Sequence, residues 1–111
     1  MHISSAAYIT IDRHPYLQLM IDQEGKQIEA LVGDIKFSML QLGYVPLTSR
    51  DPKVDWDELL PPIFVPEAPG RQALNLTGFT DDLTIVKLTR TFWEATNSKG
   101  YKDGPVKIPN K

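Results

Sequence analysis

The chain contains few of the side chains that perform nucleophilic or acid–base catalysis. It has no cysteine and two histidines, His2 and His14. Catalysis of the serine–histidine type requires an imidazole that is held by a carboxylate and lies next to a hydroxyl group. Neither histidine belongs to a nucleophile motif, no G-x-S-x-G sequence is present, and His14 precedes a proline in a predicted turn. The sequence therefore predicts no catalytic residue.

The densest group of acidic residues consists of Asp55, Asp57 and Glu58. Their spacing is not that of an EF-hand loop, and the chain contains no H-E-x-x-H, Walker or G-x-G-x-x-G sequence. We interpret this group as a solvated acidic loop, and we expect no metal and no cofactor. Acids that are distant in sequence can meet in space, so a small enzyme or small-molecule binder whose site forms only in the fold remains an alternative.

Positive charge is concentrated at the C-terminal end, whereas the whole chain has a net charge of −2. The charged residues of this end are four lysines and one aspartate: Lys99, Lys102, Lys107, Lys111 and Asp103. Tyr101 lies among them, and basic residues with interleaved aromatic rings are typical of proteins that bind single-stranded nucleic acid. A nucleic-acid-binding accessory protein that uses this tail is therefore an alternative function.

The strongest periodic pattern lies between Lys26 and Leu42. Apolar residues recur there at intervals of three and four: Ile28, Leu31, Val32, Ile35, Met39 and Leu42. This spacing predicts an amphipathic helix over residues 27–42, with one face in the core. Gly43 is typical of the position just after a helix, because glycine adopts the left-handed conformation easily.

The opposite face of this predicted helix is also apolar. It carries Ala30, Gly33, Phe37 and Leu40, where a fully solvated helix would carry charged residues. Gly33 suggests a close backbone approach on that side. Either another part of the same chain covers this face, or the face contacts a second subunit or a partner protein.

A proline-rich connection follows, over residues 49–71, and contains five of the nine prolines. Its second half must be extended or polyproline-like, and we expect the apolar residues there, Phe64 among them, to dock onto the domain. An arm offered to another protein is the alternative. Trp56 stands between two aspartates and is either an anchor for this connection or an exposed contact residue.

The remaining segments predict strands and a second helix. Apolar residues alternate over residues 3–11, as in a half-buried strand. Residues 16–21 fit a strand, and residues 22–25 after it could form the turn of a hairpin. The alternative is one long helix from Pro15 to Leu42; we favour the strand because Glu24, next to a glycine, would interrupt the apolar stripe of that helix.

Three shorter patterns complete the prediction. Residues 44–48 and 72–79 fit short strands. The first should lie at a sheet edge, because Pro46 has no N–H to donate to a neighbouring strand. A helix over residues 81–97 is predicted by an N-terminal cap with two acids and by a lysine–glycine stop.

Together these segments predict an α+β fold, in which a small, mostly antiparallel sheet packs against two helices at about 27–42 and 81–97. The proline-rich connection would cross its surface. We expect one domain over residues 1–98 and a basic, flexible tail over residues 99–111. A chain of 111 residues with 41% hydrophobic residues has the composition of a single folded domain.

The function that this pattern favours is a non-enzymatic protein-interaction module: an adaptor, an inhibitor or a small assembly subunit, oligomeric or partner-bound. The expected partner is another protein or a second copy of the chain. The candidate contact residues are Ala30, Gly33, Phe37, Leu40, Trp56 and Phe64. No basic leader and no long apolar run is present, so we expect a cytoplasmic protein that does not enter a membrane.

Overall fold

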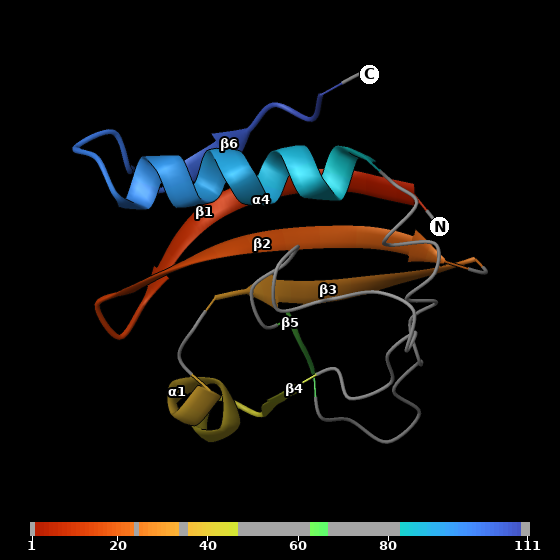
Figure 1. Cartoon of the computed structure of the whole chain (residues 1–111). Coiled ribbons are helices and arrows are strands. Elements are labelled where there is room, and N and C mark those ends of the chain that lie inside the picture. Colours follow the sequence, from red (N-terminus) through yellow and green to blue (C-terminus); the bar gives the residue numbers. More distant parts are fainter. Residues whose placement is uncertain (1, 24, 34–35, 47–62, 67–82, 110–111) are drawn as a thin grey trace, which may run out of the picture.

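The computed structural model describes residues 2–23, 25–33, 36–46, 63–66 and 83–109. These residues form an antiparallel sheet of six strands, in the order β4-β5-β3-β2-β1-β6, together with helices α1 and α4 (Figure 1). The elements are β1 (His2–Ile11), β2 (His14–Gln23), β3 (Lys26–Val32), α1 (Lys36–Gln41), β4 (Tyr44–Pro46), β5 (Ile63–Pro66), α4 (Leu83–Thr96) and β6 (Gly104–Val106). The predicted α+β fold with a mostly antiparallel sheet is thus confirmed for the described residues. Neither described helix is long and apolar enough to cross a membrane.

Two tight hairpins join the three central strands. The pairing of β1 with β2 ends at Ile11 and His14, which leaves a two-residue loop. Both loop residues, Asp12 and Arg13, have positive φ, at 51° and 69°, as a type I′ turn requires. The second hairpin joins β2 to β3 and contains Gly25, with φ of 76°. The strands predicted over residues 3–11 and 16–21 are confirmed as β1 and β2.

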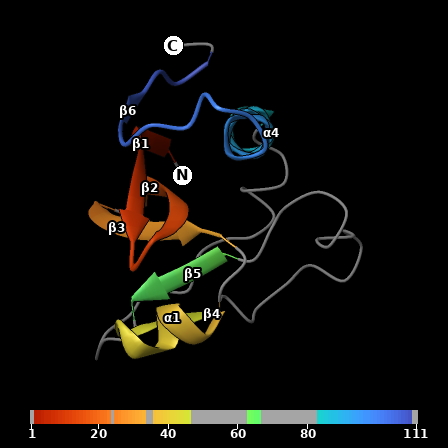
Figure 2. The same cartoon turned by 90° about the vertical axis from the view of Figure 1, so that its left-hand side faces the viewer.

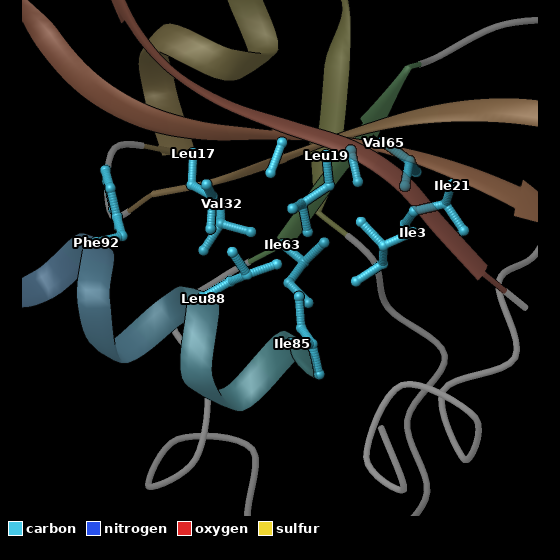
Figure 3. Close-up of a cluster of buried hydrophobic side chains, with 12 residues drawn as sticks. Ile3, Leu17, Leu19, Ile21, Val32, Ile63, Val65, Ile85, Leu88 and Phe92 are labelled. Carbon is cyan, nitrogen blue, oxygen red and sulfur yellow. The ribbon is translucent and has the colours of Figure 1, made fainter. Parts of the chain in front are cut away.

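The sheet buries side chains on both of its faces. α4 covers one face, here called the α4 face, where the larger apolar core lies (Figures 2 and 3). This core consists of Ile3, Ala6, Leu17, Leu19, Ile21, Ala30, Val32, Ile63, Val65, Ile85, Leu88 and Phe92. A smaller core lies on the other face, here called the α1 face, and consists of Tyr16, Leu31, Met39 and Phe64.

The helix predicted over residues 27–42 is wrong for its first part. Residues 26–32 form β3, which pairs with β2 in an unbroken antiparallel register. Among the described residues of this stretch only Lys36–Gln41 is helical, so a strand is followed there by a helix of six residues. Gly43 has the predicted role, because it follows the helix with φ of 83°.

The physical reason for this error is that β3 is buried on both faces near its end. Ala30 and Val32 lie in the core of the α4 face, and Leu31 lies in the core of the α1 face. Strands that are covered on both sides lose the strict alternation of apolar and polar residues. Their adjacent apolar residues then match a helical spacing by coincidence.

The other predicted elements have mixed outcomes. Of the strand predicted over residues 44–48, the described residues form β4, the outermost strand on its side; of the helix predicted over residues 81–97, Leu83–Thr96 form α4. β5 lies between β4 and β3 with Phe64 fully buried, so this piece of the proline-rich connection docks as predicted. The rest of that connection, Trp56 and the strand predicted over residues 72–79 lie outside the described residues.

The C-terminal end contributes a strand that its composition did not indicate. β6 pairs with β1, and Val106 and Ile108 pack against the core of the α4 face. The sequence predicted little regular structure for residues 99–111, and this is corrected for the three residues of β6. Edge pairing and an alternating pair of apolar residues compensate there for the low propensity of glycine and proline. The division of the chain at residue 98 and the flexibility of the tail stay predictions.

Candidate functional site

Helix α1 has one buried side and one exposed apolar side. Its Met39 is fully buried in the core of the α1 face and fixes the helix against the sheet. Three large apolar side chains remain in water: Phe37 is 70% exposed, and Leu40 and Leu42 are each 49% exposed. Among the described residues these are the exposed large hydrophobic side chains. We call them the α1 patch.

The α1 patch has a fixed position, because the sheet holds both the helix and the chain that leaves it. Met39 anchors the helix, and β4 begins directly after Gly43 and pairs with β5. A partner would therefore meet a preorganised surface and would lose little free energy in ordering it. Complete burial of a phenylalanine or leucine side chain contributes about 1.5–3 kcal/mol relative to exposure. The patch can thus stabilise a contact appreciably.

A hydrogen-bonded polar group lies next to the patch, on the α1 face. Tyr44, two residues after Leu42, donates its hydroxyl hydrogen to the carboxylate of Glu29 on β3. The side-chain amide of Gln18 on β2 donates to the other oxygen of that carboxylate. Both donors are neutral, and the described part of the chain places no lysine or arginine in a salt bridge with Glu29. The carboxylate is therefore held in one orientation by neutral donors, and no lysine or arginine among the described residues neutralises its charge.

The register of the strands shows what surrounds this polar group. Residues directly opposite in an antiparallel pair share a face, and Met20 lies opposite Glu29 while Ala7 lies opposite Gln18. Both apolar residues are partly exposed. Asp22 is exposed on the same face, opposite the exposed Gln27, and the exposed Ser5 lies opposite Met20. The described strands of the α1 face therefore carry apolar, neutral polar and acidic side chains.

The structure separates the predicted contact residues into two groups. Phe37 and Leu40 are exposed and belong to the α1 patch, whereas Ala30, Gly33 and Phe64 are buried. Trp56 lies outside the described residues.

Two details of that prediction change in the structure. Gly33 does permit a close approach, but the neighbour is this chain's own Tyr16, whose Cδ1 atom would lie 2.3 Å from an added Cβ. Leu42, assigned to the core side by its spacing, joins the exposed patch instead. The signal that sequence reasoning missed is its position next to Gly43, where the helix has already ended.

The aromatic residue of the basic tail is engaged within the fold. Tyr101 stacks on Tyr8, with ring centroids 5.4 Å apart and an interplanar angle of 21°. Its hydroxyl group donates a hydrogen bond to the backbone oxygen of Ile9, and burial is the main cause that raises the pKa of Tyr101. One ring face is thus used internally, while three lysines remain exposed: Lys99, Lys102 and Lys107.

The described residues bring together no group of three histidine, aspartate or glutamate side chains that could hold a metal ion. His14 is partly exposed at the β1–β2 hairpin. The acidic group of Asp55, Asp57 and Glu58 lies outside the described residues. Among the described residues, the α1 patch and the neighbouring α1 face of the sheet are therefore the candidate site.

Comparisons with known proteins assign no family to the chain. No family model matches it, and neither the curated proteins nor the solved structures contain a significant match. Function is therefore inferred from the residues of this chain alone.

Proposed function

We propose that this protein is a non-enzymatic protein-interaction module that binds another protein, or a second copy of itself, through the α1 patch. The observation that carries the proposal is the exposure of Phe37, Leu40 and Leu42 on and beside one short, firmly anchored helix. Single exposed hydrophobic residues are ordinary on protein surfaces, but several within one short segment can mark a contact site.

The chemistry of the patch is that of an interface centre. Aromatic side chains are enriched in interface hot spots, and Phe37 is the most exposed of the three large apolar residues. The neighbouring Tyr44 and Glu29 add polar groups of the kind that give an interface specificity. By contrast, the nucleic-acid alternative has less support, because Tyr101 uses one ring face against Tyr8.

The test is to replace patch residues one at a time and to measure association and folding separately. Phe37→Asp and Leu40→Asp place a charge where water already reaches the side chain, so we expect thermal stability to stay within the range of ordinary surface substitutions, about 0.5 kcal/mol. Thr91→Asp, at an exposed position on α4, is the matched control.

Association is measured by light scattering over a range of protein concentrations and by selection of binding peptides from a random display library. We expect wild type to self-associate or to select peptides, and each patch variant to weaken that binding about tenfold or more, as loss of a hot-spot residue does. A strictly monomeric wild type that selects no peptide contradicts the proposal. So does a large loss of stability in Phe37→Asp, because that residue would then be part of the core.

A further inference from the structure

We propose that the partner of this surface is a basic amphipathic polypeptide segment, which places apolar side chains on the α1 patch and a lysine or arginine against Glu29. This inference rests on the proposed function and specifies its partner. It follows from the charge of the surface, from the hydrogen bonds of Glu29 and from the apolar residues on either side of it.

The charge of the α1 face is negative in the described strands. Glu29 and Asp22 both lie on this face, as the register with Met20 and Gln27 shows. The three central strands contain one lysine and no arginine, and α1 begins with one further lysine, Lys36. The lysine of the strands, Lys26, alternates onto the opposite face, because it lies two residues from Ile28, which packs against the core of the α4 face. A basic segment is thus complementary to this face, and an acidic one would be repelled.

Glu29 is prepared for a cationic partner. Gln18 and Tyr44 each donate one hydrogen bond, to different carboxylate oxygens. An ionised carboxylate has about four acceptor positions, so about two remain for an incoming donor. Glu29 is partly exposed, so a partner can approach this residue from solvent. A charge-assisted hydrogen bond from lysine or arginine is roughly twice as strong as a bond between neutral groups.

Apolar surface adjoins the carboxylate in two directions. Tyr44 links Glu29 to the α1 patch, since it follows Leu42 by two residues and bonds to the carboxylate. On the other side lies the partly exposed Met20, directly opposite Glu29; on β1, the exposed Ser5 lies opposite Met20 and the partly exposed Ala7 lies opposite Gln18. Methionine side chains adapt to varied partners. A segment with apolar residues on both sides of a basic residue matches this arrangement.

The inference is tested with synthetic peptides of equal length and fluorescence-anisotropy titrations at low and at physiological salt. One peptide is an amphipathic lysine–leucine helix, the second replaces every lysine with glutamate, and the third scrambles the first so that its apolar face is lost. We expect the first peptide to bind, with an affinity that falls as salt rises, and the other two to bind at least about tenfold more weakly.

Variants of the protein then locate the binding. Glu29→Gln keeps the shape of the side chain and removes its charge, so we expect it to weaken binding of the lysine–leucine peptide about fivefold and to reduce the salt dependence. Phe37→Asp should weaken it more strongly. Glu94→Gln, an exposed carboxylate on α4, is the control and should leave binding unchanged.

The outcomes separate this inference from the proposed function. Equal binding of the glutamate peptide, or an affinity unchanged in Glu29→Gln, overturns the basic partner. If library selection on the same protein then yields neutral or acidic peptides whose binding is sensitive to Phe37→Asp, the interaction module stands and only its partner is wrong. Self-association that Phe37→Asp abolishes, without binding of the basic peptide, identifies a second copy as the occupant and also overturns the inference. If neither peptides nor copies bind, both fail.

Discussion

Gly33→Ala tests the packing that holds α1 against the sheet. Gly33 follows the last residue of β3, and a Cβ added there would lie 2.3 Å from Cδ1 and 2.5 Å from Cε1 of Tyr16. Carbon atoms in ordinary contact are about 3.5–4.0 Å apart, so the methyl group and the ring would have to separate by more than about 1 Å. Tyr16 is fully buried among side chains that are themselves buried. A displacement of the ring would therefore disturb its packing against Leu31, Met39 and Phe64.

Two opposing effects determine how much Gly33→Ala should lower the free energy of unfolding. Overpacking a well-packed core costs about 1–3 kcal/mol. Replacement of glycine by alanine restricts the unfolded chain and returns about 0.4–1 kcal/mol. We expect a net loss of about 1–2 kcal/mol, which urea denaturation resolves and which lowers the melting temperature by about 4–8 °C in a domain of this size.

A second variant and a control make this reasoning refutable. Tyr16→Val removes the two ring carbons that the new methyl group would meet, so Gly33→Ala should cost much less in that background, with a coupling energy of about 1 kcal/mol or more. Gly100→Ala is the control, because its Cβ would meet only the Oγ atom of exposed Ser98, at 3.3 Å. A neutral or stabilising Gly33→Ala, or strict additivity with Tyr16→Val, would refute the proposed contact.

Two further predictions concern the first hairpin and the tyrosines. Arg13→Gly should stabilise the protein by about 0.5–1 kcal/mol in urea denaturation, because the left-handed conformation costs an L-residue about 1–2 kcal/mol and glycine loses about 0.5–1 kcal/mol of entropy. Gly25→Ala in the second hairpin, at φ of 76°, should instead destabilise the protein. A destabilising Arg13→Gly contradicts the turn geometry. Burial raises the pKa of Tyr8 and Tyr101 above the ordinary value of 10.0. The folded state therefore binds the two hydroxyl protons more tightly than the unfolded state. Their contribution to the free energy of unfolding is fully present below pH 10 and is lost as the pH rises through the raised pKa values. The free energy of unfolding should therefore decline less steeply above about pH 10 in Tyr101→Phe than in wild type, and equal slopes would show that the two states bind the proton of Tyr101 equally.

The sequence alone was sufficient where a pattern is local. Alternation over residues 3–11 predicts β1, although the structure buries Ile3 and Ala6 and leaves Ala7, Ile9 and Ile11 only partly buried. Caps at both ends predict α4 despite its many β-branched residues. Gly43 marks the end of α1, because a left-handed residue is needed there.

The sequence was not sufficient where burial is decided by distant segments. Residues 26–32 match a helical spacing, yet the register with β2 and the cover of both faces make them a strand. A strand consists of pairings that no local window contains, so tertiary contacts override the helical pattern. The same holds for β6, whose composition disfavours a strand and whose pairing with β1 creates one.

The candidate site shows the same division. Phe37 and Leu40 were predicted as contact residues from their spacing alone, and they are exposed on α1. Only the tertiary structure added Leu42 to them and placed Glu29 between its two hydrogen-bond donors. The sequence determined the apolar character of α1 and of the strands, since that follows from residue types and their order. The fold decided which of those apolar groups stay in water, because exposure depends on what packs against each side chain.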